Sequence, residues 1–189
     1  MYEPAEDSYL LEEEIIAFCK DKNINKSLDM GTGSGVIAQT LTKFSAQVFA
    51  VDIDSKSLAK AKKNTEGKIV FLKSDLFKNV KEKDFDLIVF NPPYLPEDEH
   101  GKDKELAGGK EGVELTLEFL KQAKKHLSQE GQILFVASSL ANLNLLDKKA
   151  SKTYHLERIR ELPLFFEKLY VYKATLEKKV VDIVKDNLL

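Results

Sequence analysis

The sequence predicts an α/β protein built on a mostly parallel sheet, and three observations support this fold class. Helical and strand-like apolar patterns alternate along the chain. The strand-like runs at residues 46–51 and 86–90 are strongly apolar, which is typical of strands buried on both faces. Each polar or glycine-rich motif directly follows such a run. Ligands of parallel sheets bind outside the carboxyl ends of the strands, so these motifs are expected to share one site.

The order of the elements leaves few possible topologies. Right-handed crossovers favour five parallel strands followed by a terminal antiparallel β-hairpin. Asp7 or Ser8 is expected to cap the first helix, Asp54 or Ser55 the third, and Gly131 is expected to end the fourth. The predicted helices cover residues 8–20, 36–44, 55–63, 113–127 and 140–149, and residues 180–184 form either a helix or a strand. The predicted strands cover residues 27–30, 46–51, 68–72, 86–90, 132–136, 154–161 and 168–173.

Size and composition indicate one intracellular domain over residues 1–189. The 29 basic and 31 acidic residues give a net charge of -2, without the basic surplus typical of nucleic-acid binders. No run approaches the roughly 20 apolar residues of a membrane span, and the start of the chain is acidic, unlike a signal peptide. The single cysteine, Cys19, excludes an internal disulfide and favours the cytoplasm. The three histidines lack metal-ligand spacing, so no metal site is expected.

A glycine-rich turn follows the first predicted strand, in the sequence Asp29-Met30-Gly31-Thr32-Gly33-Ser34-Gly35. Its G-x-G-x-G spacing differs from the G-x-G-x-x-G dinucleotide fingerprint, because residue 36 is valine. Asp29 stands just before the glycines, where an anion would be repelled and a sulfonium or ammonium attracted. A plain β-to-α turn is the alternative interpretation.

Acidic residues end the next two strands. Asp52 lies about 20 residues after the first glycine, where a carboxylate can accept hydrogen bonds from both ribose hydroxyls of a nucleoside. Ile53 follows it, and Asp54 fits the role of a helix cap. In Ser74-Asp75-Leu76, the carboxylate can accept a bond from an adenine amino group or can cap the following turn.

The motif Asn91-Pro92-Pro93-Tyr94 follows the strand at 86–90 and predicts methyl transfer to a planar nitrogen. The lone pair of an amide or aniline-like nitrogen is delocalised, so such a nitrogen is a poor nucleophile. The Asn91 side-chain carbonyl and the Pro92 backbone carbonyl are two acceptors that can hold its N–H groups. The prolines stiffen the turn and preorganise these acceptors, and Tyr94 offers an aromatic face to a flat group.

Together with the start Tyr2-Glu3-Pro4-Ala5-Glu6-Asp7-Ser8, these motifs resemble the HemK/PrmC-type glutamine N5-methyltransferases. The resemblance covers residues 2–138, with an echo at 166–169, and is greatest to the short archaeal and eukaryotic branch that modifies class-1 translation release factors. It implies a class I methyltransferase fold with a seven-stranded, mostly parallel sheet and a C-terminal antiparallel hairpin. S-adenosyl-L-methionine (SAM) is the implied cofactor, and S-adenosyl-L-homocysteine the product.

The resemblance also implies roles for individual residues. Gly31, Gly33 and Asp52 would hold SAM, Asn91 and Tyr94 would hold the glutamine amide, and Glu6 and Asp7 would lie near the cofactor. From the residues alone, Glu6 and Asp7 are better explained as acids at a helix start. The segment 106–112 resembles the glycine-rich substrate loop of the family, although Leu106 and Ala107 stand where an aromatic residue is usual. The predicted cofactor-binding residues are Glu6, Asp29, Gly31, Thr32, Gly33, Gly35, Asp52, Ile53, Ser74, Asp75, Leu76 and Asn91, and the predicted catalytic residues are Asn91, Pro92 and Tyr94.

The implied acceptor is the glutamine of a Gly-Gly-Gln tripeptide in a release factor, and a small zinc-binding activator protein is an implied partner. Three other functions stay open. The Asn-Pro-Pro-Tyr motif also occurs in adenine-N6 and guanine-N2 methyltransferases of nucleic acids, which need a basic face and a route for base extrusion. Methylation of protein lysine and a catalytically silent scaffold are the remaining alternatives.

Overall fold

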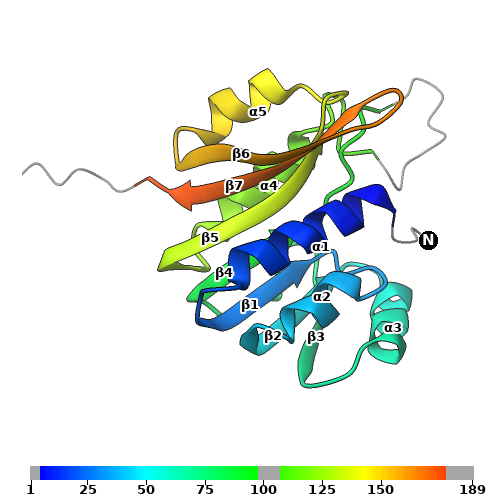
Figure 1. The fold of residues 1–189 in the computed structure, drawn as a ribbon, viewed down its shortest axis with the longest axis vertical. Coiled ribbons are helices and arrows are strands. Elements are labelled where there is room, and N and C mark those ends of the chain that lie inside the picture. The colour runs from blue at the N-terminus through cyan, green and yellow to red at the C-terminus, as the bar shows by residue number, and fades with distance from the viewer. Residues whose placement is uncertain (1–4, 98–106, 178–189) are drawn as a thin grey trace, which may run out of the picture.

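A computed structural model describes residues 5–97 and 107–177 and confirms the predicted α/β class (Figure 1). Its sheet has seven strands in the order β3-β2-β1-β4-β5-β7-β6. The strands are β1 Ile24–Met30, β2 Ser45–Asp52, β3 Ile69–Lys73, β4 Phe85–Phe90, β5 Leu127–Ser138, β6 Tyr154–Pro163 and β7 Lys168–Leu176. The helices are α1 Glu6–Cys19, α2 Val36–Leu41, α3 Ser55–Asn64, α4 Glu114–Ala123 and α5 Leu143–Ala150.

The first five strands pair in parallel, and β7 runs antiparallel to both of its neighbours, β5 and β6. The predicted terminal hairpin is therefore confirmed. Successive strands are added toward one edge of the sheet from β1 to β3 and toward the other edge from β4 onward. The turns after the neighbouring strands β1 and β4 therefore lie side by side at one end of the sheet. That switch point is where ligands of such sheets bind.

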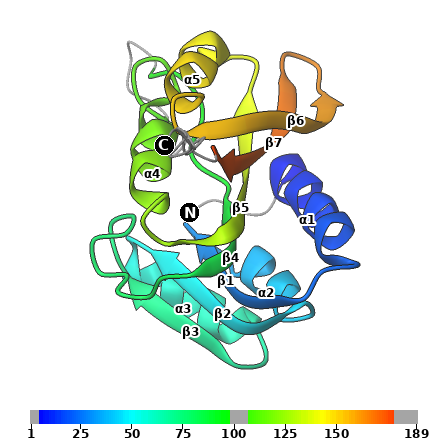
Figure 2. The ribbon, with the colours of Figure 1, turned by 90° about the vertical axis from the view of Figure 1, so that its left-hand side faces the viewer.

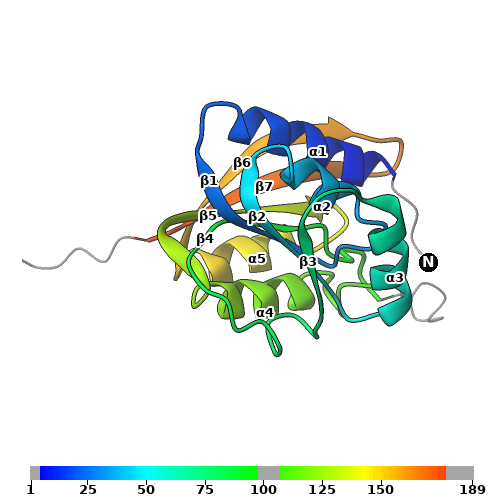
Figure 3. The same ribbon diagram turned by 90° about the horizontal axis from the view of Figure 1, so that it is seen from below.

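Helices cover both faces of the sheet, as Figures 2 and 3 show. One core layer packs α1 and α2 against the strands through residues such as Leu11, Ile15 and Leu41, with the free thiol of Cys19 buried among them. The other layer packs α4 and α5 through residues such as Phe119 and Leu146. No helix in residues 5–97 or 107–177 is long and apolar enough to cross a membrane.

Several predicted element boundaries differ from the structure by a few residues, and two of these differences change the role expected of a residue. Helix α4 ends at Ala123, and Gly131 lies inside β5 instead of ending the helix. A side chain at residue 131 would collide with the carbonyl of Phe85 across an irregular stretch of strand pairing, which explains the glycine. Helix α1 begins at Glu6, and neither Asp7 nor Ser8 caps it, because both lie inside its first turn. The cap by Asp54 is confirmed, since its carboxylate accepts from the backbone N–H groups of Lys56 and Ser57. Residues 180–184 lie outside the described residues.

Phe119 connects the core to the catalytic motif, which leads to a stability prediction. Its ring packs on Phe90, the residue before Asn91, with centroids 4.5 Å apart, and it also contacts Phe77. Because Phe119 is fully buried, Phe119→Ala is expected to lower the free energy of unfolding by about 3–5 kcal/mol. The exposed Phe166 is the control, and Phe166→Ala should change the free energy of unfolding by less than about 0.5 kcal/mol. Urea denaturation of both variants is the measurement; equal losses would contradict this packing.

Candidate active site

A cavity of about 800 Å³ opens at the carboxyl ends of the parallel strands. Its walls come from the turns after β1, β2, β3 and β4, from the start of α1 and from the turn between β6 and β7. The three motifs predicted to share a site therefore do meet in one place. Part of the lining is apolar, including Met30, Leu76, Phe90 and Leu115, which suits a ligand with a flat hydrophobic part.

The glycine-rich turn wraps closely around the end of β1. Gly31, Gly33 and Gly35 all have positive φ angles, of 66°, 52° and 89°, which side-chain-bearing residues rarely adopt. Gly31 and Gly33 line the cavity, so ligand atoms can approach their backbone. Gly35 serves packing instead, because an added Cβ would lie 2.7 Å from Thr65 and 3.0 Å from Ala61.

Asp29 points away from the cavity and into the fold. Its carboxylate is buried and accepts a hydrogen bond of 3.0 Å from the backbone N–H of Ala38 in α2. Burial raises the pKa of Asp29 to about 7, while the bond from Ala38 acts in the opposite direction. The residue thus anchors the first turn of α2 to β1, and it does not line the cavity as a partner for a cation.

Asp52 is held in place by backbone amides on both of its oxygens. Oδ2 accepts from the Gly33 N–H at 2.9 Å, and Oδ1 accepts from the Asp54 N–H at 2.8 Å. Each carboxylate oxygen has a further lone pair, so Asp52 can still accept two bonds from a ligand. Ile53 beside it lines the cavity with 63% of its surface exposed, which leaves an apolar face for a ligand to cover.

Ser74, Asp75 and Leu76 line the cavity from the turn after β3. The Ser74 hydroxyl accepts a bond of 2.9 Å from the Asn79 N–H, so it also caps this turn. Asp75 forms an exposed ion pair with Lys78 at 2.6 Å. Leu76 has a φ of 46°, an uncommon conformation for a residue with a side chain, which places its backbone at the cavity wall.

Asn91 is oriented by the first turn of α1. Its Nδ2 group donates to the Asp7 carboxylate at 3.1 Å and to the Ser8 hydroxyl at 3.3 Å. The Tyr94 hydroxyl donates to the same Asp7 oxygen at 3.3 Å. The opposite amide orientation would turn the Asn91 oxygen toward a carboxylate, so the network fixes which end carries the oxygen. That oxygen, Oδ1, is buried and accepts no hydrogen bond from the described residues.

The glycine-rich segment 107–112 packs against the backbone of the Asn-Pro-Pro-Tyr turn. Leu95 pairs with Ala107, and the Gly108 N–H donates to the Leu95 carbonyl at 2.9 Å. A Cβ at Gly108 would lie 2.5 Å from the Pro93 oxygen, and one at Gly112 would lie 2.6 Å from the Tyr94 oxygen. Residues 107–112, the described part of the expected substrate loop, therefore support the Asn-Pro-Pro-Tyr turn through backbone contacts. Residues 98–106, which include Leu106, lie outside the described residues.

The structure brings most of the predicted site residues together. All three predicted catalytic residues line the cavity, and so do Gly31, Gly33, Asp52, Ile53, Ser74, Asp75 and Leu76. Four residues predicted to bind the cofactor do not line it. Thr32 and Gly35 are buried in the turn, Asp29 faces α2, and Glu6 is exposed on α1.

Sequence reasoning missed several lining residues, above all Glu167, whose carboxylate accepts from Ser138. It also missed Ser8, which holds Asn91 without lining the cavity itself. The echo of the family at residues 166–169 includes Glu167 but implied no role for it. The pairing of β7 with β5 brings this residue to the site that the strand ends of β1–β4 build.

The lining of the cavity is strongly acidic. Among the residues that the structure describes, five carboxylates line the cavity, those of Asp7, Asp52, Asp54, Asp75 and Glu167, and one ammonium, that of Lys56. Such a surface repels the phosphates of a nucleic acid and favours neutral or cationic ligands.

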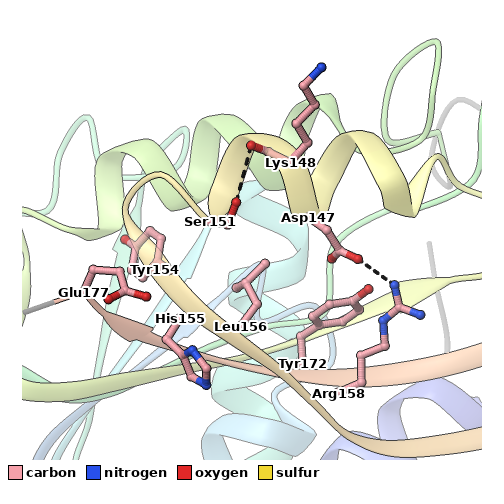
Figure 4. Close-up of a pocket in the computed structure, with 9 residues that line it drawn as sticks. All are labelled: Asp147, Lys148, Ser151, Tyr154, His155, Leu156, Arg158, Tyr172 and Glu177. Atoms are coloured by element: carbon pink, nitrogen blue, oxygen red, sulfur yellow. Dashed lines mark hydrogen bonds and ion pairs between the residues drawn. The ribbon is translucent and has the colours of Figure 1, made fainter.

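A second cavity, of about 490 Å³, lies between α5, β6 and the end of β7 (Figure 4). Arg158 on its wall forms an ion pair of 2.7 Å with Asp147 and lies over the ring of Tyr172. None of the sequence motifs reaches this cavity. Within the described ranges, no group of three or more His, Cys, Asp or Glu side chains could hold a metal ion.

The sheet order and the composite cavity define a class I SAM-dependent methyltransferase. The chain belongs to the methyltransferase small domain family, which it matches over residues 12–160.

Relatives within this family carry names that specify acceptors. A protein of Methanocaldococcus jannaschii with the provisional name protein N5-glutamine methyltransferase is 36% identical over 92% of this chain and 91% of its own length. A release factor glutamine methyltransferase of Borreliella burgdorferi is 31% identical over 84% of this chain, which spans 61% of that longer protein. A tRNA1(Val) (adenine(37)-N6)-methyltransferase of Glaesserella parasuis is 30% identical over 67% of this chain and 57% of its own length.

Solved structures share the fold. Mtq2 of E. cuniculi, in the Mtq2-Trm112 complex that methylates the eRF1 translation termination factor, has a TM-score of 0.75 at 23% identity, over 93% of this chain and 98% of that chain. The T. thermophilus 16S rRNA N2 G1207 methyltransferase has a TM-score of 0.69 at 21% identity, over 93% of this chain and 44% of that chain. These likenesses establish the architecture.

The raised pKa of Asp29 predicts a pH dependence of stability. Between pH 3.8, its ordinary pKa, and about 7, the folded state holds a proton that the unfolded state has released. This carboxyl therefore makes folding less favourable as the pH rises through that window, by up to roughly 4 kcal/mol in total. Asp29→Asn keeps an acceptor for the Ala38 N–H and removes the effect.

The measurement is urea denaturation at pH 5 and pH 7. The unfolding free energy at pH 7, relative to pH 5, should be higher in Asp29→Asn than in the wild type. Asp54→Asn is the control and should leave the difference between the two pH values unchanged. The pKa of Asp54 lies below its ordinary value, mainly because the Lys56 N–H binds it, so this group is ionised at both pH values. Identical pH profiles for Asp29→Asn and the wild type would refute a raised pKa.

Proposed function

We propose that this protein transfers a methyl group from SAM to the side-chain amide nitrogen of a glutamine in another protein. The observation that carries the proposal is the Asn91 side chain, whose N–H end is held by Asp7 and Ser8 while its buried oxygen lacks a donor. A buried acceptor without a partner is costly, and the amide N–H of a bound glutamine would satisfy it.

The residues around the cavity fit SAM. The Asp52 carboxylate, fixed by two backbone N–H groups, is placed to accept from the two ribose hydroxyls. The exposed face of Ile53 and the nearby Leu76 suit the adenine ring, and Asp75 suits its amino group. The backbone of Gly31 and Gly33 leaves room for the amino-acid part of SAM. When bound, SAM would supply an electrophilic methyl carbon, which a nitrogen lone pair can attack in one step with the thioether sulfur as the leaving group.

The Asn-Pro-Pro-Tyr turn makes the acceptor nitrogen reactive. The Asn91 oxygen and the Pro92 carbonyl accept hydrogen bonds from the two N–H groups of the glutamine amide, which draws the nitrogen lone pair away from conjugation with the amide carbonyl. The nitrogen–carbon bond would form as the sulfur–carbon bond breaks, S-adenosyl-L-homocysteine would leave with the electron pair of that bond, and the nitrogen would then release one proton to water. Acceptors that are rigid before the reaction need no reorganisation during it, and each is worth roughly 1–4 kcal/mol.

The acidic cavity favours a protein over a nucleic acid. A base methyltransferase would bring phosphates close to Asp7 and Glu167 on the acceptor side. The relative from G. parasuis that is named for tRNA adenine supports methylation of a nucleic-acid base as a second candidate function, because adenine also presents a conjugated NH2 group. Lysine is a weaker candidate, because its amine must be deprotonated and gains nothing from two acceptors.

A translation release factor is the proposed acceptor, supported by the name of the B. burgdorferi relative. The name of the M. jannaschii relative supports a glutamine in a protein. We also propose a small activator subunit as a partner, since the Mtq2 structure is that of a two-protein complex. That this subunit binds zinc stays a prediction. A cytoplasmic location accords with an acceptor that works in translation.

The test is incubation with labelled SAM and, separately, a purified class-1 release factor, the same factor with its Gly-Gly-Gln glutamine replaced by alanine, and total tRNA. Label is expected on the intact factor alone. Label on tRNA and none on the factor would establish the nucleic-acid function instead. The assay is run with and without a candidate activator protein, because a required subunit would otherwise hide the activity.

Asn91→Ala is expected to lower kcat by at least about 100-fold, because it removes one of the two acceptors. SAM affinity should stay within about threefold, since the ribose and adenine contacts do not involve this side chain. Calorimetric titration with SAM and turnover measurements at saturating release factor separate the two effects. Normal turnover by this variant would refute the proposed role of Asn91.

Asp52→Ala is expected to weaken SAM binding by at least about tenfold, because it removes the ribose acceptor and also frees the Gly33 N–H that shapes the turn. The matched control is Asp54→Ala, which removes a neighbouring carboxylate that caps α3. This control should change the SAM dissociation constant by less than about threefold. Equal affinity losses in the two variants would place the ribose elsewhere.

A further inference from the structure

The turn between β6 and β7 exposes two phenylalanine rings to solvent. We call residues 164–167 the hairpin tip. Phe165 is 92% exposed and Phe166 is 84% exposed, the highest values among the large apolar side chains that the structure describes. Burying apolar rings of this size against a partner would remove a large apolar surface from water, which folding of this chain does not do. An adjacent exposed pair of this kind is typical of an interaction surface.

The hairpin tip is tied down by backbone bonds. The Leu164 N–H donates to the Glu167 carbonyl at 2.8 Å and closes the turn. The Ser139 N–H donates to the Lys168 carbonyl at 2.8 Å, and the Lys168 N–H donates to the Ser139 hydroxyl at 2.8 Å. The two rings meet edge to face, with centroids 4.5 Å apart. The rings therefore stand on a turn that is fastened to the end of β5.

The hairpin tip is continuous with the acceptor side of the cavity. The side chain of Glu167 lines the cavity together with Asn91 and Tyr94, and Ser138 donates to its carboxylate. The predicted cofactor contacts come from the turns after β1, β2 and β3, toward the other edge of the sheet. Figure 1 shows the turn between β6 and β7 at the same end of the sheet as the start of α1, which supplies Asp7. A protein whose glutamine enters the cavity would thus pass beside the rings.

We propose that the Phe165–Phe166 pair is a docking surface for the protein that accepts the methyl group. This inference rests on the proposed function and adds to it a requirement on the acceptor. The loop that carries the acceptor glutamine should present apolar side chains to the rings, with basic residues nearby to complement the acidic cavity. Contacts made away from the reacting amide supply affinity for the protein while leaving the chemical step unchanged.

The test is the double variant Phe165→Ser/Phe166→Ser, assayed with release factor at saturating SAM. The KM for the release factor should rise about tenfold or more, while kcat stays within about twofold. With a short peptide that contains only the Gly-Gly-Gln tripeptide and one residue on each side, kcat/KM should be unchanged, because such a peptide is too short to engage the rings. Calorimetric SAM binding and thermal unfolding verify that the variant is folded.

Val70→Ser is the matched control. Val70 is 45% exposed on β3, the opposite edge strand of the sheet, and its replacement should leave the KM for the release factor within about twofold. An unchanged KM in the double variant would overturn the docking surface while leaving the proposed function intact, whereas a wild-type enzyme that is inert both with and without the candidate activator would overturn both. A loss of self-association by the double variant, with KM unaltered, would assign the rings to a second copy of this chain and would also overturn the proposal.

Discussion

The site depends on one interaction, the hydrogen bond between the Asn91 amide and the buried Asp7 carboxylate. A carboxylate acceptor makes such a bond stronger than one between neutral groups, worth about 1.5–3 kcal/mol. Asp7 lies in the first turn of α1, where the helix dipole stabilises its negative charge. The bond joins the first helix to the end of β4 and fixes the position of the Asn91 side-chain nitrogen, and therefore that of its oxygen. Without it, the side chain could rotate and the acceptor would lose its orientation.

The surrounding structure keeps this arrangement rigid. Behind the catalytic turn, Gly108 and Gly112 let a second segment lie directly against the backbone of Pro93 and Tyr94. Below it, Phe90 packs into the core on Phe119. On the cofactor side, Asp52 binds the N–H groups of Gly33 and Asp54, so the two turns hold each other in place. Each part of the cavity wall is thus supported by hydrogen bonds or packing before any ligand is present.

The fold and the three motifs could be predicted because their signals are local. Alternating apolar patterns indicated the parallel strands, and the position of each motif after a strand placed them at one end of the sheet. The roles of Asp29 and Glu167 could not be predicted in this way. The direction of the Asp29 side chain depends on where α2 packs, and Glu167 reaches the cavity only through the pairing of β7 with β5. Likewise, the residues alone predict Asp7 or Ser8 as a helix cap, because nothing near them in the sequence reveals Asn91 as their partner.

The position of Asp7 has a consequence for how the site responds to heat or denaturant. Asp7 lies only two residues after Ala5, the N-cap of α1. Helix ends open locally at a lower free energy than the core of a sheet. Opening of this first turn would release Asn91 and Tyr94 while the strands stay paired, so methyl transfer is expected to fail before the fold as a whole is lost.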